Sequence, residues 1–312
     1  MMTVQRLTVW LSALLAVSAF MLLGRPVQAQ NPYTQPGLFL NYGFSVNSMT
    51  NAQIETVVEW LQVRGIQKQF LNVGAFNSNG TLSASNYTQL AHWITVSRET
   101  EPGQQIIVYI SGTLSNVNSS AKDWQNIANV CQTFLTTYGV DGVNLDFEPY
   151  STSASNYIGM LTTIRNTIGW TANLSLDYTA DSSAFWSGND FNTISGYINY
   201  IMLMIYDSGS TTVAQYDSFI ATAMEYAYNW KVHGCAIVPI VPVYASSSVH
   251  NPSIENIETS TNEIWYLTQT DPTVEINDIA VWWYDGWNGS NIGNNSMSAP
   301  TDAMWTTYWL DR

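Results

Sequence analysis

Basic residues are scarce in this chain: its 312 residues include 9 Lys+Arg against 23 Asp+Glu, a net charge of −14 at pH 7. Nucleic acids and anionic membrane surfaces select proteins with basic patches. We therefore expect neither of them as a partner. A neutral substrate is compatible with this charge balance.

Cysteine and histidine are also scarce. The two cysteines, Cys131 and Cys235, cannot form a disulfide framework, so a single bridge and two buried free thiols both remain open. The three histidines (His92, His233 and His250) are scattered and lack the spacing of metal ligands. The sequence therefore predicts no metal site and no cofactor.

Long apolar runs are missing except near the N-terminus. Leu7–Leu23 is apolar, Arg6 precedes it, and small residues at 27 and 29 allow cleavage before Gln30. This order is typical of a secretory signal, although an uncleaved membrane anchor is the alternative. We expect residues 1–29 to be removed, which changes the net charge to −16, and the protein to be secreted and free of the membrane.

No Pro-rich or Ser-rich linker divides residues 30–312, a length that can bury one sizeable core. Short apolar runs recur there, each followed by a helical pattern, at the spacing of a strand–helix unit. We predict strands at Gly37–Tyr42, Gln69–Gly74, Gln105–Ser111, Gly142–Glu148, Ala172–Tyr178, Tyr200–Tyr206, Ala236–Tyr244 and Asp278–Trp283.

Eight strands alternating with helices predict an α/β fold, a single closed (β/α)8 TIM barrel over residues 30–312. An open doubly wound sheet would favour a Gly-rich phosphate loop after the first strand, and residues 41–45 are no such loop. Thr50 and Gln53 form a capping-box pattern, and Gly139 and Gly169 stand where helices should end. Residues 181–195 are only weakly helical in pattern.

The fourth predicted strand has one apolar and one polar face when it is read with a period of two. Its alternating side chains are Val143, Leu145 and Phe147 on one face and Asn144, Asp146 and Glu148 on the other. A solvated edge strand is the plain alternative, but the apolar face is too hydrophobic for an edge. Because catalytic groups of barrels lie at the carboxyl ends of strands, the polar face predicts a site there.

The predicted strand ends are acidic and aromatic, which fits glycoside hydrolysis better than acyl or phosphoryl transfer. They offer Tyr42, Ser111, Asp146, Glu148, Asp177, Tyr178, Tyr206, Asp207, Tyr244, Trp282 and Trp283. Asp146 and Glu148 are neighbours on one face, so each disfavours ionisation of the other. This helps keep Glu148 protonated, as a general acid requires.

Two motifs resemble those of family 18 glycoside hydrolases. The stretch Asp141-Gly142-Val143-Asn144-Leu145-Asp146-Phe147-Glu148 resembles the fourth-strand signature of that family, and Met204-Ile205-Tyr206-Asp207 resembles its sixth-strand M-x-Y-D. The Trp282/Trp283 pair resembles its floor tryptophan, and Tyr109-Ile110-Ser111-Gly112 matches its third-strand motif only in part.

The resemblance implies a retaining mechanism in which the substrate's own acetamido oxygen is the nucleophile. Glu148 would be the acid and then the base, Asp146 would hold the acetamido N–H, and Tyr206 would bond the acetamido carbonyl. Asp207 would support sugar contacts, with a helix N-cap as its alternative role, and Trp282 or Trp283 would stack beneath the sugar.

Asn144 departs from the commoner Asp of the family pattern and cannot share a proton, so we expect it to line the site and to alter the pH profile. Tyr42 is a further candidate for cleft lining, with core packing as the alternative. The substrate implied is a polymer of β-1,4-linked N-acetylglucosamine, and we expect a monomer. Peptidoglycan or N-glycans as substrates, and a carbohydrate-binding barrel without turnover, are the other hypotheses.

Overall fold

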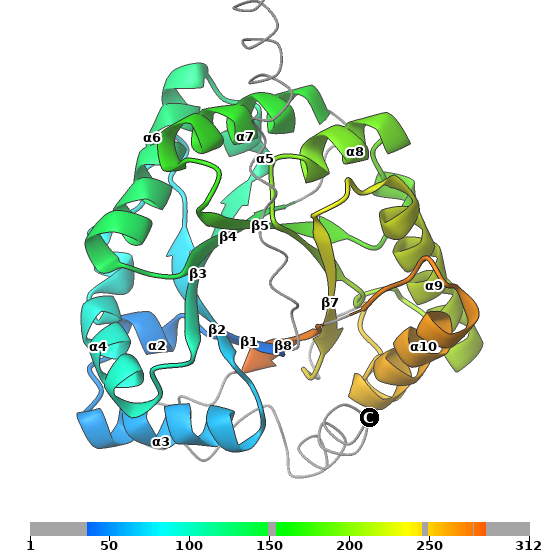
Figure 1. Ribbon diagram of the computed structural model, residues 1–312, viewed down its shortest axis with the longest axis horizontal. Helices are drawn as coiled ribbons and strands as arrows, with labels where there is room; N and C mark the ends of the chain where they lie inside the picture. Colours follow the sequence, from blue (N-terminus) through cyan, green and yellow to red (C-terminus); the bar gives the residue numbers. More distant parts are fainter. Residues whose placement is uncertain (1–35, 149–153, 245–248, 277, 285–312) are drawn as a thin grey trace, which may run out of the picture. The chain divides into compact units, whose positions relative to one another are not determined.

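The computed structural model describes residues 36–148, 154–244, 249–276 and 278–284. In these ranges eight strands close into a parallel barrel in which each strand pairs with its sequence neighbours and β8 pairs with β1 (Figure 1). The strands are β1 (Gly37–Leu40), β2 (Lys68–Ala75), β3 (Gln105–Thr113), β4 (Gly142–Glu148), β5 (Asn173–Thr179), β6 (Tyr200–Met204), β7 (Ala236–Pro242) and β8 (Ala280–Tyr284). The predicted (β/α)8 barrel is confirmed.

Helices surround the ring of strands (Figure 1). Their bounds are α2 (Gly43–Val46), α3 (Asn51–Val63), η1 (Ala84–Tyr87), α4 (Leu90–Thr100), α5 (Leu114–Val117), α6 (Ala121–Thr133), η2 (Phe134–Tyr138), α7 (Ala154–Ile168), η3 (Ser182–Ala184), α8 (Gly188–Ser195), α9 (Val213–Trp230) and α10 (Ile257–Thr270). No helix in the described ranges is long and apolar enough to cross a membrane.

Local signals place the helix ends. The Thr50 N–H donates to Gln53 Oε1 at 2.8 Å and the Gln53 N–H donates to Thr50 Oγ1 at 3.3 Å, which confirms the capping box of α3. Gly139 and Gly169 follow their helices with φ of 66° and 79°, in the left-handed region that favours glycine. In the weakly patterned segment, Ser187 Oγ caps α8 by accepting from the Asp190 N–H at 3.2 Å.

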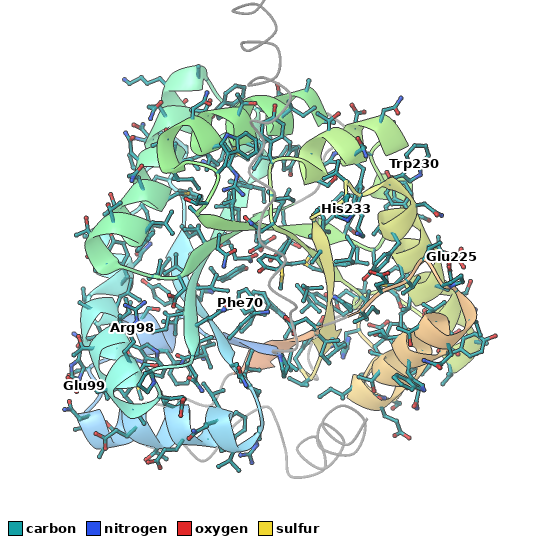
Figure 2. All side chains as sticks on the ribbon, viewed as in Figure 1. Phe70, Arg98, Glu99, Glu225, Trp230 and His233 are labelled. Atoms are coloured by element: carbon teal, nitrogen blue, oxygen red, sulfur yellow. The ribbon has the colours of Figure 1, made fainter. Side chains whose placement is uncertain are left out.

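Strand alternation divides the apolar side chains into two clusters. The cluster inside the barrel is aromatic and includes Phe39, Phe70 and Tyr109, and Figure 2 shows Phe70 among the strands. The larger cluster lies between strands and helices and contains Val143, Leu145 and Phe147 of β4. The predicted apolar face of β4 therefore packs outward against helices, and its polar face points into the barrel.

Three predicted strands run past the ends that the structure shows, and the predicted eighth strand begins two residues too early. The chain leaves β1 after Leu40 because the Gly43 N–H donates to Asn41 Oδ1 at 2.8 Å, which forms a turn. β6 ends at Met204 ahead of Asp207, whose φ of 55° is left-handed and ends an extended chain. β7 ends at Pro242, and one further backbone bond, from the Val243 N–H to Trp282 O at 2.7 Å, follows it.

The two cysteines are free and buried, so the alternative of two free thiols is confirmed. Burial raises the pKa of both thiols to about 12, which keeps them protonated and poorly reactive.

A buried ion pair joins β2 to Asp278, two residues before β8: Lys68 Nζ donates to Asp278 Oδ2. Both residues are almost fully buried. Removing one member of such a pair leaves an uncompensated charge, whereas replacing both by apolar residues is often neutral or stabilising.

We predict that Lys68→Met lowers the free energy of unfolding by about 3–5 kcal/mol, because Asp278 would remain buried without its cation. The double variant Lys68→Met/Asp278→Leu should recover most of that loss. Urea unfolding at neutral pH measures both values. A single variant as stable as the wild-type protein would contradict the prediction.

Candidate active site

The polar face of β4 forms the floor of the barrel mouth. Asn144 is fully buried and Asp146 is 6% exposed, while Glu148 at the end of the strand is accessible. Tyr109 of β3 donates its hydroxyl to Asp146 Oδ2 at 2.7 Å. Burial and the charge of Asp146 raise the pKa of Tyr109 well above its usual range, so its hydroxyl remains a donor.

Asn144 bridges two residues of β5. Its amide donates to Asp177 Oδ1 at 2.8 Å, and Ser175 Oγ donates to Asn144 Oδ1 at 2.5 Å. Asp177 is fully buried, and its Oδ2 has no hydrogen-bond partner among the described residues. Burial, followed by the charge of Asp146, raises the pKa of Asp177 well above its usual range. The site thus has a further carboxyl, that of Asp177, beside Asn144 on the neighbouring strand.

Glu148 opens onto the cleft. It lines a cavity of about 770 Å³ together with Thr179, Asp181, Ser182, Ala184, Met204, Tyr206, Asp207, Ser208 and Phe219. Desolvation, followed by the charges of Asp146 and Asp207, raises the pKa of Glu148 to about 7. A carboxyl with this pKa can donate a proton and later accept one at neutral pH.

Aromatic rings close the inner side of the site. Tyr206, which follows β6, lies over Trp282 of β8 with ring centroids 6.0 Å apart and planes at 16°. Trp282 also meets Phe39 and Tyr109 edge to face, at 5.0 and 5.6 Å. Burial, then the charges of Asp177 and Asp146, raise the pKa of Tyr206 well above its usual range and keep its hydroxyl protonated. The ring of Trp282 therefore lies inside the barrel.

Asp207 has an unusual backbone for a residue with a side chain. Its φ of 55° is left-handed, which costs about 1–2 kcal/mol for most residues and less for Asp, whose short side chain can bond locally. Tyr244, just beyond β7, donates its hydroxyl to Asp207 Oδ1 at 2.6 Å. The N-cap of α9 is Thr212, so the alternative role of Asp207 as a helix cap is wrong.

Behind Asp207 lies a small polar network from the segment before α10. His250 Nδ1 donates to Glu255 Oε2 at 2.9 Å, and Ser208 Oγ donates to Glu255 Oε1 at 2.6 Å. Within the described ranges, Asp207, His250 and Glu255 are the one group whose ligand atoms, all within 4.8 Å, could hold a metal ion. His250 Nδ1 and both carboxylate oxygens of Glu255 take part in these bonds, while His250 Nε2 is buried without a hydrogen-bond partner among the described residues.

Tyr42 and Trp283 are the two remaining predicted site residues, and neither has a described contact with the acids of the site. Tyr42 follows β1, is 37% exposed, and donates its hydroxyl to Asn86 Oδ1 of η1 at 3.1 Å, which excludes core packing. Its contact with a sugar stays a prediction. The side chain of Trp283 lies outside the described part of the chain.

Several residues of the site carried no assigned role in the sequence. For Asp177 a signal existed in the sequence. Ser175 pairs in register with Asn144, and Asp177 stands two residues after Ser175, so its side chain lies on the same face of β5 as that of Ser175, toward the barrel interior. Tyr109 belonged only to a partial motif. His250 and Glu255 lie more than 40 residues after Asp207, and no spacing rule connects them.

The fold resembles solved structures of several enzymes. The Ostrinia furnacalis Group IV chitinase is 13% identical with a TM-score of 0.61, and the alignment covers 88% of this chain and 100% of that one. A chitinase from Rhizomucor miehei is 13% identical with a TM-score of 0.60, covering 89% and 100%. The Bacillus cereus spore cortex-lytic enzyme SleL is 10% identical with a TM-score of 0.61, covering 88% and 74%. At these identities the likeness concerns the fold alone.

No curated protein matches the sequence. A family model does: the one described as glycosyl hydrolases family 18 matches residues 36–308. This range contains all eight strands, the polar face of β4 and the Tyr206–Asp207 pair. The chain belongs to glycosyl hydrolase family 18.

Proposed function

We propose that the protein is a secreted glycoside hydrolase that cleaves polymers of β-1,4-linked N-acetylglucosamine, with retention of configuration and with the substrate's acetamido group as the nucleophile. The observation that carries the proposal is the position and acidity of Glu148. Its pKa of about 7 suits a group that donates and then accepts a proton, and it lines a cavity of about 770 Å³.

In the first step Glu148 protonates the glycosidic oxygen, and the acetamido carbonyl oxygen attacks the anomeric carbon as the glycosidic bond breaks. The product is an oxazolinium ion. Asp146 accepts a hydrogen bond from its N–H and stabilises its positive charge. Tyr206, whose raised pKa keeps the hydroxyl protonated, donates to the acetamido oxygen.

In the second step the ionised Glu148 takes a proton from water as the water oxygen attacks the anomeric carbon. The bond between that carbon and the acetamido oxygen breaks, which restores the acetamido group. Glu148 is then protonated again, so atoms and charge balance over the cycle. Trp282, stacked with Tyr206 inside the barrel, offers an apolar surface beneath the sugar. Tyr109 fixes one oxygen of Asp146 throughout.

The charge around the cleft favours chitin over peptidoglycan. Glu148, Asp181 and Asp207 line the cavity, and the whole chain carries −14. Peptidoglycan carries carboxylates on its lactyl groups and peptides, which these acids repel, whereas chitin is neutral. Peptidoglycan or N-glycan cleavage, and sugar binding without turnover, are the competing outcomes.

We predict that Glu148→Gln reduces kcat on acetylated chito-oligosaccharides by about 10²–10⁴-fold, the usual contribution of general acid–base catalysis, while oligosaccharide binding is retained. Product release measures kcat, and calorimetry measures binding. Wild-type protein assayed in parallel on peptidoglycan separates the two hydrolase hypotheses.

Glu263→Gln is the matched control for this variant. Glu263 of α10 is partly buried, and burial and then Asp217 raise its pKa to about 7, as for Glu148. Glu263 is not among the residues that line the cavity of Glu148. It should leave kcat unchanged. Wild-type protein that binds oligosaccharides but cleaves no substrate would reject the enzyme, and equal rates in wild-type and Glu148→Gln protein would reject the role of Glu148.

We predict that kcat/KM falls as the pH rises through about 7, because Glu148 must be protonated to act as the acid. The charge of Asp207 is one cause of that raised pKa. In Asp207→Asn the carboxyl of Glu148 should therefore ionise at lower pH, and the alkaline limb of the profile should move in the same direction. A limb that stays in place would show that Asp207 does not act on Glu148.

We also propose that residues 1–29 are removed on secretion. The N-terminal peptide of protein recovered from culture medium should then begin at Gln30, which mass spectrometry can establish. Protein retained in the membrane fraction with an intact N-terminus would instead support an anchor.

A further inference from the structure

Glu255 is a buried carboxylate that the proposed mechanism does not use. It is 1% exposed and stands between β7 and α10. Burial alone would raise its pKa, but hydrogen bonds from His250 and Ser208, the charge of His250 and the Asp207 backbone N–H together lower it below the usual range. A buried carboxylate with this many donors is ionised and held in place.

Two of these donors belong to the segment that follows β6. The Asp207 N–H and Ser208 Oγ, from adjacent residues, both bond the carboxylate of Glu255. A third bond joins the same two segments, because the Gly209 N–H donates to Val249 O at 3.1 Å. Hydrogen bonds from Asp207 itself and from the two residues after it therefore hold the left-handed backbone at Asp207 against residues 249–255.

The side chain of Asp207 is held from the same region. Tyr244 donates its hydroxyl to Asp207 Oδ1, and the Tyr244 ring stacks on His250 with centroids 4.2 Å apart and planes at 25°. His250 in turn donates to Glu255. The contacts thus close a ring from Glu255 through His250, Tyr244 and Asp207 back to Glu255.

We propose that Glu255 is a positioning residue for the reaction: through Asp207, it controls the proton affinity of Glu148. This inference rests on the proposed function only for its catalytic consequence. Glu255 is not among the residues that line the cavity of Glu148, and its charge is not among those that raise the pKa of Glu148. Asp207, which contacts Glu255 and is one of those charges, is the path by which Glu255 would act.

The titratable groups that act on these two carboxyls come from several strands, helices and connecting segments. Glu148 interacts with Asp146 of its own strand, Asp177 of β5, Tyr157 of α7, and Tyr206 and Asp207 after β6. Glu255 interacts with Tyr216 of α9, Tyr244 and His250. Asp207 is the group that contacts Glu255 and also raises the pKa of Glu148.

The test compares Glu255→Gln, Asp207→Asn and the double variant. Glu255→Gln keeps the shape but removes the charge that orders Asp207, so kcat/KM should fall about 10- to 100-fold, as for a small displacement of a catalytic group. The alkaline limb should move to lower pH, as in Asp207→Asn. The double variant should match Asp207→Asn, because the two changes act on one path.

A direct titration separates this inference from the proposed function. The Glu148 carboxyl can be followed by NMR in protein labelled with ¹³C-glutamate, with Glu148→Gln for assignment, and this readout needs no turnover. Its pKa should fall in Glu255→Gln and stay unchanged in Glu263→Gln. An unchanged Glu148 pKa, or a double variant with additive shifts, would overturn the proposal even if chitin is cleaved.

Should Glu255→Gln fail to fold, Ser208→Ala provides a second route. It removes one donor to Glu255 and leaves the carboxylate and His250 in place. Thermal unfolding checks the fold of each variant. A smaller shift of the Glu148 pKa in the same direction supports the proposal, and no shift in well-folded protein counts against it.

Discussion

Side-chain alternation in a closed barrel is the constraint on which this molecule depends. Every second residue of β4 must enter the barrel, where there is little water to solvate charge. Asn144, Asp146 and Glu148 therefore meet Asp177 and Tyr109 in a confined space. Burial raises the pKa of Asp177 well above its usual range, and it raises the pKa of the accessible Glu148 to about 7. The acidity of the site therefore follows from taking carboxyl groups out of water.

Features that rest on short-range rules could be predicted from the sequence. The eight apolar runs, the capping box at Thr50 and the left-handed ends at Gly139 and Gly169 all depend on residues within a few positions of one another. The two faces of β4 follow from a period of two and needed no tertiary information. The motif around Tyr206 added the second half of the site because its spacing matched a known pattern.

The remainder depends on contacts between segments far apart in the chain. Whether Trp282 or Trp283 turns inward depends on the register of β8 against β1, which composition does not encode. The ring around Asp207 joins the end of β6 to residues that follow β7, and its bonds form only once the barrel has brought those strands together. The early end of β6 has the same origin, because the backbone turns at Asp207 and Ser208, where both residues donate hydrogen bonds to Glu255.

The pairing of β8 with both β1 and β7 has a consequence for synthesis. The barrel cannot close until β8 (Ala280–Tyr284) has been synthesised. One edge of β1 therefore stays unpaired until β8 is available. Until then β1 and β7 present unpaired strand edges, which attract other chains. A ribosome-bound chain that lacks β8 should therefore depend on protection from aggregation, and Trp282 joins the aromatic rings of the barrel interior only with that last strand.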